Sequence, residues 1–357
     1  MKKKLIKKGK IIFVERCDGK YISPTKIGKQ LNSSWHISKC LRKQGVASSI
    51  LSHFNLKNKV ATNFLRCISS NPVDVAQQIK RLNCNTIIIS SWIELLCELG
   101  NYKKRKILVF RGMRNLDNVK KYKKQINHYA FKIVAVSNTQ ARVLIEAGLK
   151  RNKILVIPNG IDFKIFRARQ GKRILRSLVY IGALAKEKGV DILLDAFMLL
   201  HKKYPDTRLV ICGSEKIYGI KNHEFSKKIK TISGIKFKGL ISQQKIAKIL
   251  SNTSYCIVPT NPNLIFETFS KATHEAQLMG CLPIVSTSGC LPEVVQDNKN
   301  GFIFKMYSSD GLYKKLLEIF KKDRIKIDKI RKMTVSMARS RWLSWNEVAF
   351  KFLEILN

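Results

Sequence analysis

Short apolar runs alternate along the chain with longer stretches whose apolar positions recur every three or four residues. Two such helical patterns, Ile37–Gln44 and Thr139–Ala147, are each followed by glycine, a residue that commonly ends a helix. In the N-terminal half the apolar runs predict strands at Ile11–Val14, Ser48–Leu51, Thr86–Ser90, Ile107–Phe110, Ile133–Val136 and Leu155–Ile157. This alternation is typical of β–α units around a parallel sheet.

The alternation restarts after Arg167–Arg173, a polar segment with one glycine that we interpret as a linker. An amphipathic helix is predicted over Asp191–Lys203. Further strands are predicted at Leu178–Ile181, Leu209–Cys212, Ile235–Phe237, Tyr255–Val258 and Leu282–Ser286. The pattern therefore predicts two consecutive α/β domains with a crevice between them where a ligand binds.

Composition is that of a globular protein, with 357 residues of which 45% are apolar and 26% are charged. The longest apolar stretch, Thr86–Leu96, contains Ser90, Ser91 and Glu94 and is shorter than the roughly 18 residues of a membrane helix. The basic start, Met1–Lys10, precedes an apolar run too short for a signal peptide. We expect a cytoplasmic protein. The nine scattered cysteines form no Cys-x-x-Cys pair, which favours buried thiols over disulfides or a zinc site.

The formal charge of +44 is large and uneven. Residues 1–165 hold 34 Lys and Arg against 8 Asp and Glu, a charge of +26, and the remainder holds 34 against 16, a charge of +18. Such a surface attracts nucleic acid or anionic lipid headgroups, with clusters at Lys2–Lys10, Lys103–Lys106 and Lys120–Lys124. Compositional drift explains the charge equally well, because lysine is abundant throughout, so charge alone names no partner.

The segment Pro259–Val295 is the most informative part of the chain. A strand ends at Pro259, a loop contains Glu267, and a helix runs through Glu275 to Gly280. If this helix begins near Phe269 or Ser270, its unpaired N–H groups and dipole provide a seat for a diphosphate. The carboxylates of Glu267 and Glu275 could then accept hydrogen bonds from sugar and ribose hydroxyl groups on either side of the diphosphate. From spacing alone, an exposed helix that happens to carry two acids is the simpler interpretation.

A second segment, Tyr180–Gly189, combines a strand, a glycine turn at Gly182 and Lys188 just before a helix. This arrangement brings backbone and an ammonium group toward phosphate oxygens. It is neither a GxGxxG fingerprint nor a Walker loop, and similar turns occur throughout α/β proteins.

Taken in order, these segments and several others form a specific series. The chain contains Val136-Ser137-Asn138, Pro158-Asn159-Gly160-Ile161-Asp162, Gly182…Glu187-Lys188-Gly189, Glu267-x7-Glu275, Pro283-Ile284-Val285, Pro292-Glu293-Val294, Gly301-Phe302 and Trp345. The series resembles the retaining glycosyltransferases of the GT-B fold, the large family four of sucrose, lipopolysaccharide and mannosyl transferases. The resemblance is close from about Ala135 to Phe304 and resumes in the terminal helix.

The resemblance implies two Rossmann-like domains facing each other across a crevice. Residues 1–166 would bind the acceptor, residues 174–338 would bind the donor, and a C-terminal helix within residues 339–357 would pack back on the first domain. This helix is expected around Trp342–Leu356.

The resemblance implies a nucleotide-sugar donor, which we expect to be UDP- or GDP-linked although no motif specifies the base, and matching motif positions assign the residues that bind it. Its diphosphate would be bound by Lys188, the turn at Gly182 and the backbone of Phe269–Ser270. Glu275 would hold the ribose hydroxyls, and Glu267 would act on the transferred sugar as the catalytic residue. The family needs no cofactor and no metal, since basic residues and the helix dipole offset the leaving-group charge.

The chain departs from the family pattern at three places. Ala183 stands where an arginine usually contacts the diphosphate, and Lys186 is a candidate substitute. The N-terminal glycine-rich loop is not recognisable, with Gly19 and Gly28 the nearest candidates. Arg111 stands where the family has an acceptor-side histidine. Two interpretations stay open: Arg111 binds a phosphate or a sugar acid of the acceptor, or it is a surface arginine in a basic loop.

The sequence therefore predicts a metal-independent, retaining transfer of a hexose-type sugar onto a glycan or lipid-linked acceptor, as in lipopolysaccharide or polysaccharide synthesis. The cationic acceptor half favours peripheral contact with an anionic membrane surface, and no nucleic acid is expected as a partner. Two alternatives stay open: a degenerate homologue that binds nucleotide without turnover, and a nucleic-acid-binding protein suggested only by charge. We expect His274 to face solvent or a neighbouring loop.

Overall fold

A computed structural model describes residues 10–15, 33–52, 64–66, 69–113, 116–168, 173–217, 220–221 and 223–356. These residues form two compact units. The first contains the described residues up to Gly160 together with those from Leu343 onward, and the second runs from Ile161 to Trp342.

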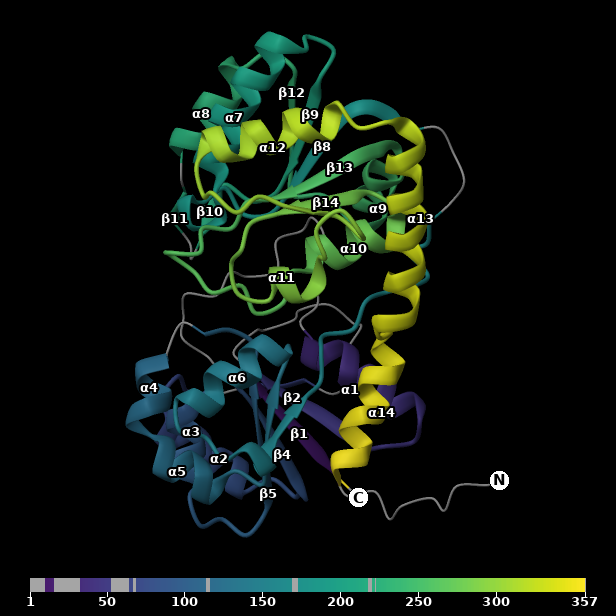
Figure 1. The fold of residues 1–357 in the computed structure, drawn as a ribbon. Helices are drawn as coiled ribbons and strands as arrows, with labels where there is room; N and C mark the ends of the chain where they lie inside the picture. The colour runs from purple at the N-terminus through teal and green to yellow at the C-terminus, as the bar shows by residue number, and fades with distance from the viewer. Residues whose placement is uncertain are drawn as a thin grey trace, which may run out of the picture. The chain divides into compact units, whose positions relative to one another are not determined.

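A parallel seven-stranded sheet forms the centre of the first unit (Figure 1). Its strand order is β3-β2-β1-β4-β5-β6-β7. Six of these strands overlap the predicted ones, and β3, only three residues long, was not predicted. The bounds are β1 Ile11–Glu15, β2 Ser48–Ser52, β3 Phe64–Arg66, β4 Thr86–Ser90, β5 Arg105–Phe110, β6 Lys132–Ala135 and β7 Ile154–Val156.

Helices cover both faces of this sheet. One face packs against α2 Pro72–Lys80, α3 Ile93–Leu99, α4 Leu116–Lys121, α5 Lys123–Tyr129 and α6 Asn138–Glu146. The other packs against α1 Ser33–Lys43 and the C-terminal helix α14 Trp345–Leu356, which lie side by side in Figure 1. Val348, Ala349 and Phe352 of α14 are buried in the same core as Ile37 and Leu41 of α1. The last helix therefore completes the first unit.

The second unit contains a parallel six-stranded sheet of order β12-β9-β8-β13-β14-β15. The bounds are β8 Ile174–Ile181, β9 Arg208–Cys212, β12 Ile235–Gly239, β13 Thr253–Val258, β14 Leu282–Val285 and β15 Phe302–Ile303. All five predicted strands are present, and the two-residue β15 was not predicted. A separate antiparallel pair, β10 Lys216–Ile217 and β11 Ile220–Lys221, was also not predicted.

Two cores enclose this second sheet because its side chains alternate between faces. Tyr255 and Ile257 enter one core with α7 Val190–Lys203, α8 His223–Thr231 and α12 Ser309–Phe320. Cys256 and Val258 enter the other with α9 Gln243–Asn252, α10 Lys271–Met279 and α11 Leu291–Val294. The long helix α13 Arg324–Arg341 lies along α10 (Figure 1). Two single-turn 3-10 helices, Arg151–Lys153 and Lys186–Lys188, complete the elements.

The unit boundaries differ from the predicted domain boundaries. Ile161 and Phe166 are buried in the core of the second unit, so the first unit ends at Gly160 and not at residue 166. The segment Arg167–Arg173 is therefore not a linker between the units. Its residues 169–172 lie outside the described residues, and Arg173 donates hydrogen bonds to the carbonyls of Leu250 and Thr253.

The C-terminal end of the second unit also differs from the prediction. Trp342 closes α13 as its C-cap residue, and α14 begins at Trp345. The helix expected over Trp342–Leu356 is thus shorter at its start, and the unit boundary falls after Trp342 instead of after residue 338.

Both sheets change winding direction at one point, between β1 and β4 in the first unit and between β8 and β13 in the second. In doubly wound sheets, ligands bind outside the carboxyl ends of the strands at this switch point. The seven described cysteines are free thiols and are buried or half-buried. In the described part of the chain, the structure contains no helix with the length and apolar character to cross a membrane.

Candidate functional site

The ion pair between Lys188 and Glu267 lies at the switch point of the second sheet. Lys188 follows β8 and Glu267 follows β13, the two strands that flank the reversal. Lys188 Nζ is 2.8 Å from Glu267 Oε2, and 28% and 13% of the two side chains are exposed. The fold thus brings together two of the predicted site residues that are 79 positions apart in sequence.

Gly189 allows the turn that presents Lys188. Its φ of 71° is in the left-handed region, and it caps the N-terminus of α7. A Cβ atom at this position would lie 1.8 Å from the carbonyl oxygen of Pro259 at the end of β13. Asn261 N also donates to Glu187 O at 3.0 Å. The two loops of the switch point are therefore packed backbone against backbone.

Gly182 lies in the turn after β8, where the sequence placed it. Its N–H donates to Cys212 O at 3.0 Å, and a Cβ would lie 2.7 Å from the hydroxyl of Tyr180. That hydroxyl donates to Ala183 O at 2.7 Å. Burial raises the pKa of Tyr180, so the phenol keeps its proton and holds the turn. Ala183 stands in this turn without a charged side chain, and the candidate substitute Lys186 is exposed.

Glu267 is held by its backbone as well as by its carboxylate. Thr260 Oγ1 donates to Glu267 Oε2 at 3.3 Å, in addition to Lys188. The N–H of Glu267 donates to Ser288 Oγ at 3.2 Å, and its carbonyl accepts from Cys290 N at 2.7 Å. The carboxylate therefore has a fixed position at the edge of the sheet.

The helix predicted to seat a diphosphate begins where expected. Ser270 is the N-cap of α10, and its Oγ accepts from Thr273 N at 3.4 Å. The other N–H groups of the first turn have no partner within a helix, and they carry the positive end of its dipole. Glu267 precedes this N-terminus, so a cation and a helix end lie at the same strand edge.

His274 packs against neighbouring loops, one of the two positions that we expected, and does not face solvent. Its ring stacks on Phe269 at 4.1 Å and lies 4.2 Å from the ring of Trp342. The imidazole is 2% exposed, and its Nδ1 lies 2.6 Å from Ser270 O. Burial lowers the pKa of His274 to about 4, so the ring is neutral at pH 7. The sequence signal for this packing was the spacing along the helix, because His274 lies one turn after Phe269 and Ser270.

Glu275 is the most unusual group of the site. It lies in the second turn of α10, and only 4% of its surface is exposed. No hydrogen bond or ion pair with another residue that the structure describes holds its carboxylate. Burial raises the pKa of Glu275 to about 7, although the nearby Lys271 opposes this shift. A buried acceptor without a partner is costly unless a ligand supplies donors.

Arg111 belongs to the first unit and is not a surface arginine. It follows β5, its N–H donates to Ser91 Oγ at 3.1 Å, and Nη1 donates to Asn159 Oδ1 at 2.7 Å. Burial lowers the pKa of Arg111, and the carboxylate of Glu15 opposes this shift. Asn159 Oδ1 also accepts from Ser33 Oγ at 3.0 Å. This cluster lies at the carboxyl edge of the first sheet.

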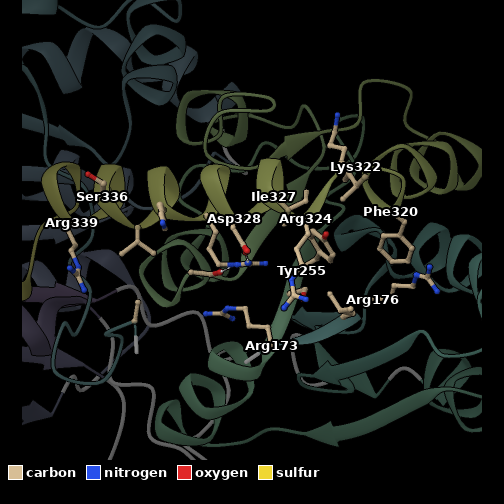
Figure 2. Close-up of a pocket in the computed structure, with 18 of the residues that line it drawn as sticks. Arg173, Arg176, Tyr255, Phe320, Lys322, Arg324, Ile327, Asp328, Ser336 and Arg339 are labelled. Carbon is tan, nitrogen blue, oxygen red and sulfur yellow. Dashed lines mark hydrogen bonds and ion pairs between the residues drawn. The ribbon is translucent and has the colours of Figure 1, made fainter. Parts of the chain in front are cut away.

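The structure thus gathers Gly182, Lys188, Glu267, Phe269, Ser270 and Glu275 at one edge of the second sheet. Sequence reasoning missed Tyr180, Thr260, Ser288 and His274, which position them. Gly19, Gly28 and most of Lys2–Lys10 lie outside the described residues. Among the residues described, no group of three or more His, Cys, Asp or Glu side chains is arranged to hold a metal ion. A cavity of about 1310 Å³ lies elsewhere in the second unit, where β8 and β13 begin (Figure 2).

Comparison with known proteins identifies related chains. A sequence model of the family described as glycosyl transferases group 1 matches residues 162–341. The chain is 24% identical to mannosylfructose-phosphate synthase of Agrobacterium fabrum over 63% of this chain and 52% of that protein. It is 23% identical to spore coat protein SA of Bacillus subtilis over 57% of this chain and 59% of that protein. The match thus spans little more than half the length of these relatives.

Solved structures share the fold over nearly the whole length. HepE of Anabaena, crystallised in complex with UDP-glucose, superposes with a TM-score of 0.76 at 15% identity and covers 98% of this chain and 99% of that one. A glycosyltransferase from Rickettsia africae superposes with a TM-score of 0.78 at 19% identity, with 98% of each chain covered. At such identities the likeness establishes the two-domain α/β fold of GT-B proteins, which the sequence predicted.

Proposed function

Because the chain belongs to the glycosyl transferases group 1 family, we propose that it transfers a hexose-type sugar from a nucleoside diphosphate sugar to an acceptor hydroxyl. The observation that carries the proposal is the switch point of the second sheet. There Lys188 offers a cation, the N-terminus of α10 offers N–H donors, and the buried Glu275, which has no hydrogen-bond or ion-pair partner among the described residues, offers an acceptor. A nucleoside diphosphate sugar presents the complementary groups: phosphate oxygens and ribose hydroxyls.

Each group has a distinct task in this proposal. Lys188 and the backbone at Phe269–Ser270 bind the diphosphate beside the turn at Gly182, and Glu275 accepts hydrogen bonds from the ribose. Glu267 holds the sugar while the bond between its anomeric carbon and the diphosphate breaks. The acceptor hydroxyl oxygen attacks the same face of that carbon, and its proton passes to the leaving diphosphate oxygen. The ammonium group of Lys188, which pairs with Glu267, also contacts the phosphate that gains negative charge as the bond breaks. The configuration at that carbon is retained.

We propose that the transfer needs no metal ion. The leaving diphosphate is stabilised by Lys188 and by the dipole of α10, which act where the negative charge develops. Transfer should therefore survive EDTA. Loss of activity on chelation, restored by one divalent cation, would overturn this part of the proposal.

The acceptor is a glycan or a lipid-linked glycan, and the first unit binds it. Arg111 supports this, because a buried guanidinium at a strand edge suits a phosphate or sugar acid. The charge of +26 on residues 1–165 favours work at an anionic membrane surface, for example in polysaccharide synthesis. Binding to anionic vesicles should fall with salt and with neutralisation of Lys103–Lys106 and Lys120–Lys124. Equal binding to neutral and anionic vesicles would contradict the membrane proposal.

A degenerate homologue that binds nucleotide without turnover is the second candidate, and Ala183 favours it because one diphosphate contact is missing. An active transferase and a degenerate homologue would both bind the nucleotide, but only the active transferase would turn over the donor. Multiple-turnover release of UDP or GDP from the matching nucleotide-sugar in the presence of acceptor separates them.

The pair Glu267→Gln and Glu275→Gln tests the site itself. Glu275→Gln should weaken binding of the free nucleoside diphosphate, because that ligand keeps its ribose. Glu267→Gln should leave this binding nearly unchanged and sharply reduce transfer, because its partner is present only with the sugar. Calorimetry with UDP and GDP measures the nucleotide affinity of each variant, and an activity assay measures its rate of sugar transfer. Equal loss of nucleotide affinity in both variants, or full activity in both, would place the site elsewhere.

A further inference from the structure

The chain that follows β5 is held by side chains at the point where the paired strands end. The last paired residue of β5 is Phe110, opposite Ala135 of β6. Arg111 and Gly112 come next, beyond the paired residues of both neighbouring strands. Backbone groups withdrawn from water need partners, so other groups have to supply what the sheet no longer does.

Ser91 supplies a partner on the side of β4. Its N–H donates to Val109 O at 2.9 Å, and its Oγ donates to the same carbonyl at 3.3 Å and accepts from Arg111 N at 3.1 Å. The φ of Ser91 is 50°, in the left-handed region that glycine occupies more easily than serine. Backbone strain of this kind at the edge of a sheet points to a function. Here the strained residue provides the hydroxyl that pairs the N–H of Arg111.

Gln140 supplies a partner on the side of β6, from the first turn of α6. Its side chain is 0% exposed. Its Oε1 accepts from Val136 N at 2.8 Å, and its Nε2 donates to Gly112 O at 3.4 Å. Ser137 caps the helix and accepts from Gln140 N at 3.2 Å, which fixes the place from which the side chain extends. One buried amide thus joins the loops after β5 and β6.

Both halves of the Gln140 amide are used. A carboxylate in its place would still accept from Val136 N, but it would face the carbonyl of Gly112 with no hydrogen to donate. Leucine would leave both backbone groups without this partner, which costs free energy where they are buried. The position therefore requires a side chain that both donates and accepts.

The guanidinium of Arg111 is held separately, at the far end of the side chain. Its Nη1 donates to Asn159 Oδ1 at 2.7 Å, and the carboxylate of Glu15 acts on it electrostatically. The backbone and the tip of Arg111 are therefore both fixed before any ligand arrives. A side chain arranged in this way loses less conformational entropy on binding, which favours affinity.

We propose that Ser91 and Gln140 are positioning residues for the acceptor: they hold Arg111 and Gly112 so that the guanidinium meets the anionic group of the acceptor. The inference rests on the proposed function, in which Arg111 binds a phosphate or a sugar acid. Both residues act through Arg111 and not on the substrate. Their loss weakens binding of a sugar acid and leaves binding of a nucleoside diphosphate unchanged.

Binding of glucuronate to the full chain, measured by ligand-detected NMR with glucose as the neutral probe, tests the proposal. Ser91→Gly and Gln140→Leu should each lower the affinity for glucuronate by roughly tenfold, because a buried hydrogen bond is lost. Ser91→Gly is the sharper variant, since glycine relieves the strain at this φ and removes only the hydroxyl. A serine with a purely structural role in the turn would be replaced by glycine without loss. The affinities for UDP and GDP should change by no more than about twofold.

Gln140→Glu adds a pH-dependent readout. At pH 8 the ionised carboxylate cannot donate to Gly112 O, whereas at pH 5 the protonated group can donate there and still accept from Val136 N. The affinity for glucuronate, divided by the wild-type value at the same pH, should fall about tenfold at pH 8 and recover at pH 5. Division by the wild-type value removes the titration of other groups, including Glu15. Exchange of the Arg111 amide, followed by mass spectrometry, should rise and recover in parallel.

Matched controls carry the same changes in the second unit. Gln277 of α10 is 1% exposed, with its Nε2 donating to Val294 O at 3.3 Å, and Asn298 has a φ of 60°. Gln277→Leu and Asn298→Gly should leave the affinity for glucuronate within about twofold of the wild-type value. Unchanged affinity in Ser91→Gly and Gln140→Leu, or a loss in Gln140→Glu that persists at pH 5, would overturn the proposal.

Failure of the acceptor role of Arg111 would give a different result. In that case Arg111→Gln would bind glucuronate as well as the wild type does, or the wild type would bind glucuronate no better than glucose. Faster exchange of the Arg111 amide in the Ser91 and Gln140 variants would then show that these two residues stabilise the loop without serving acceptor binding, and the inference would be wrong.

Discussion

The two units have the same strand order around their switch points, yet their carboxyl edges carry different chemistry. In the second unit two loops meet backbone to backbone, and Lys188, Glu267 and the N-terminus of α10 converge there. In the first unit a buried arginine, Arg111, is held by Asn159 and lies beside Ser91. The shared sheet topology thus sets where a ligand can bind, and the loops after the strands determine which ligand binds there.

The second unit also places a strained glycine and two buried titratable side chains at its edge. Gly189 is pressed against Pro259, His274 is buried as a neutral ring, and Glu275 is buried as a carboxyl group. Groups of this kind reduce stability unless a ligand makes use of them.

The largest expected effect is that of Gly189→Ala. The new Cβ would lie 1.8 Å from Pro259 O at a φ of 71°, so strain and overpacking together should cost about 4 kcal/mol. Gly45 of the first unit has a φ of 76° and nothing within 4 Å of the added atom, so Gly45→Ala should cost about 1 kcal/mol. Scanning calorimetry measures both. Equal costs would show that the loops are not in close contact.

Glu275→Gln should stabilise the protein at high pH. The folded-state pKa of about 7 is above the ordinary value of 4.5, so ionisation opposes folding and its cost develops as pH rises from 4.5 through 7. Glutamine avoids that cost, which should raise the free energy of unfolding by about 3 kcal/mol at pH 8 and by little at pH 4.5. The exposed Glu146→Gln of the first unit should shift stability by no more than about 0.5 kcal/mol. A pH-independent effect of Glu275→Gln would refute the burial argument.

Lys188→Ala should lower the affinity for a nucleoside diphosphate by roughly ten- to a hundredfold, because a charge-assisted contact to phosphate contributes about 1.5–3 kcal/mol. Arg111→Lys should leave that affinity unchanged and reduce transfer to the acceptor. Calorimetry and transfer rates separate the two effects. Loss of nucleotide affinity in Arg111→Lys would mean that the donor is not bound by the second unit alone.

The smallest effect concerns His274. Its folded-state pKa of about 4 is below the ordinary 6.5, so the unfolded chain binds the proton first, and stability falls as pH drops from 6.5 toward 4. This contribution should amount to about 1 kcal/mol between pH 6.5 and 5.5, and His274→Gln should remove it. His128→Gln, at an exposed position of the first unit, should keep the wild-type slope. Identical slopes in both variants would contradict a buried neutral ring.

Much of the architecture could be predicted from the order of apolar and polar residues. Every predicted strand overlaps an observed one, because buried parallel strands appear as continuous apolar runs. The strands that were missed, β3, β10, β11 and β15, are two or three residues long and too short to show a period. The first unit's boundary was misplaced because Ile161 and Phe166 are buried by contacts distant in sequence.

The site was predicted in part. The motif series named Gly182, Lys188, Glu267, Phe269, Ser270 and Glu275, and the cap at Ser270 follows from local chemistry. Direct contact between Lys188 and Glu267 could not be derived, because it depends on β8 and β13 being neighbours in the sheet. The hydrogen bonds of Arg173 to the carbonyls of Leu250 and Thr253 could not be predicted either, because they join segments far apart in the sequence.

The sequence by itself determined the two α/β units, the helix that begins after Ser270 and the residue types at its N-terminus, because periodicity and capping act over a few neighbouring residues. Only the tertiary structure decided that α14 completes the core of the first unit and that His274 is buried between two aromatic rings. It also gave Glu275 a pKa near neutrality. The physical reason is that burial is set by whatever the rest of the chain packs against a residue, and desolvation then changes the chemistry of that residue.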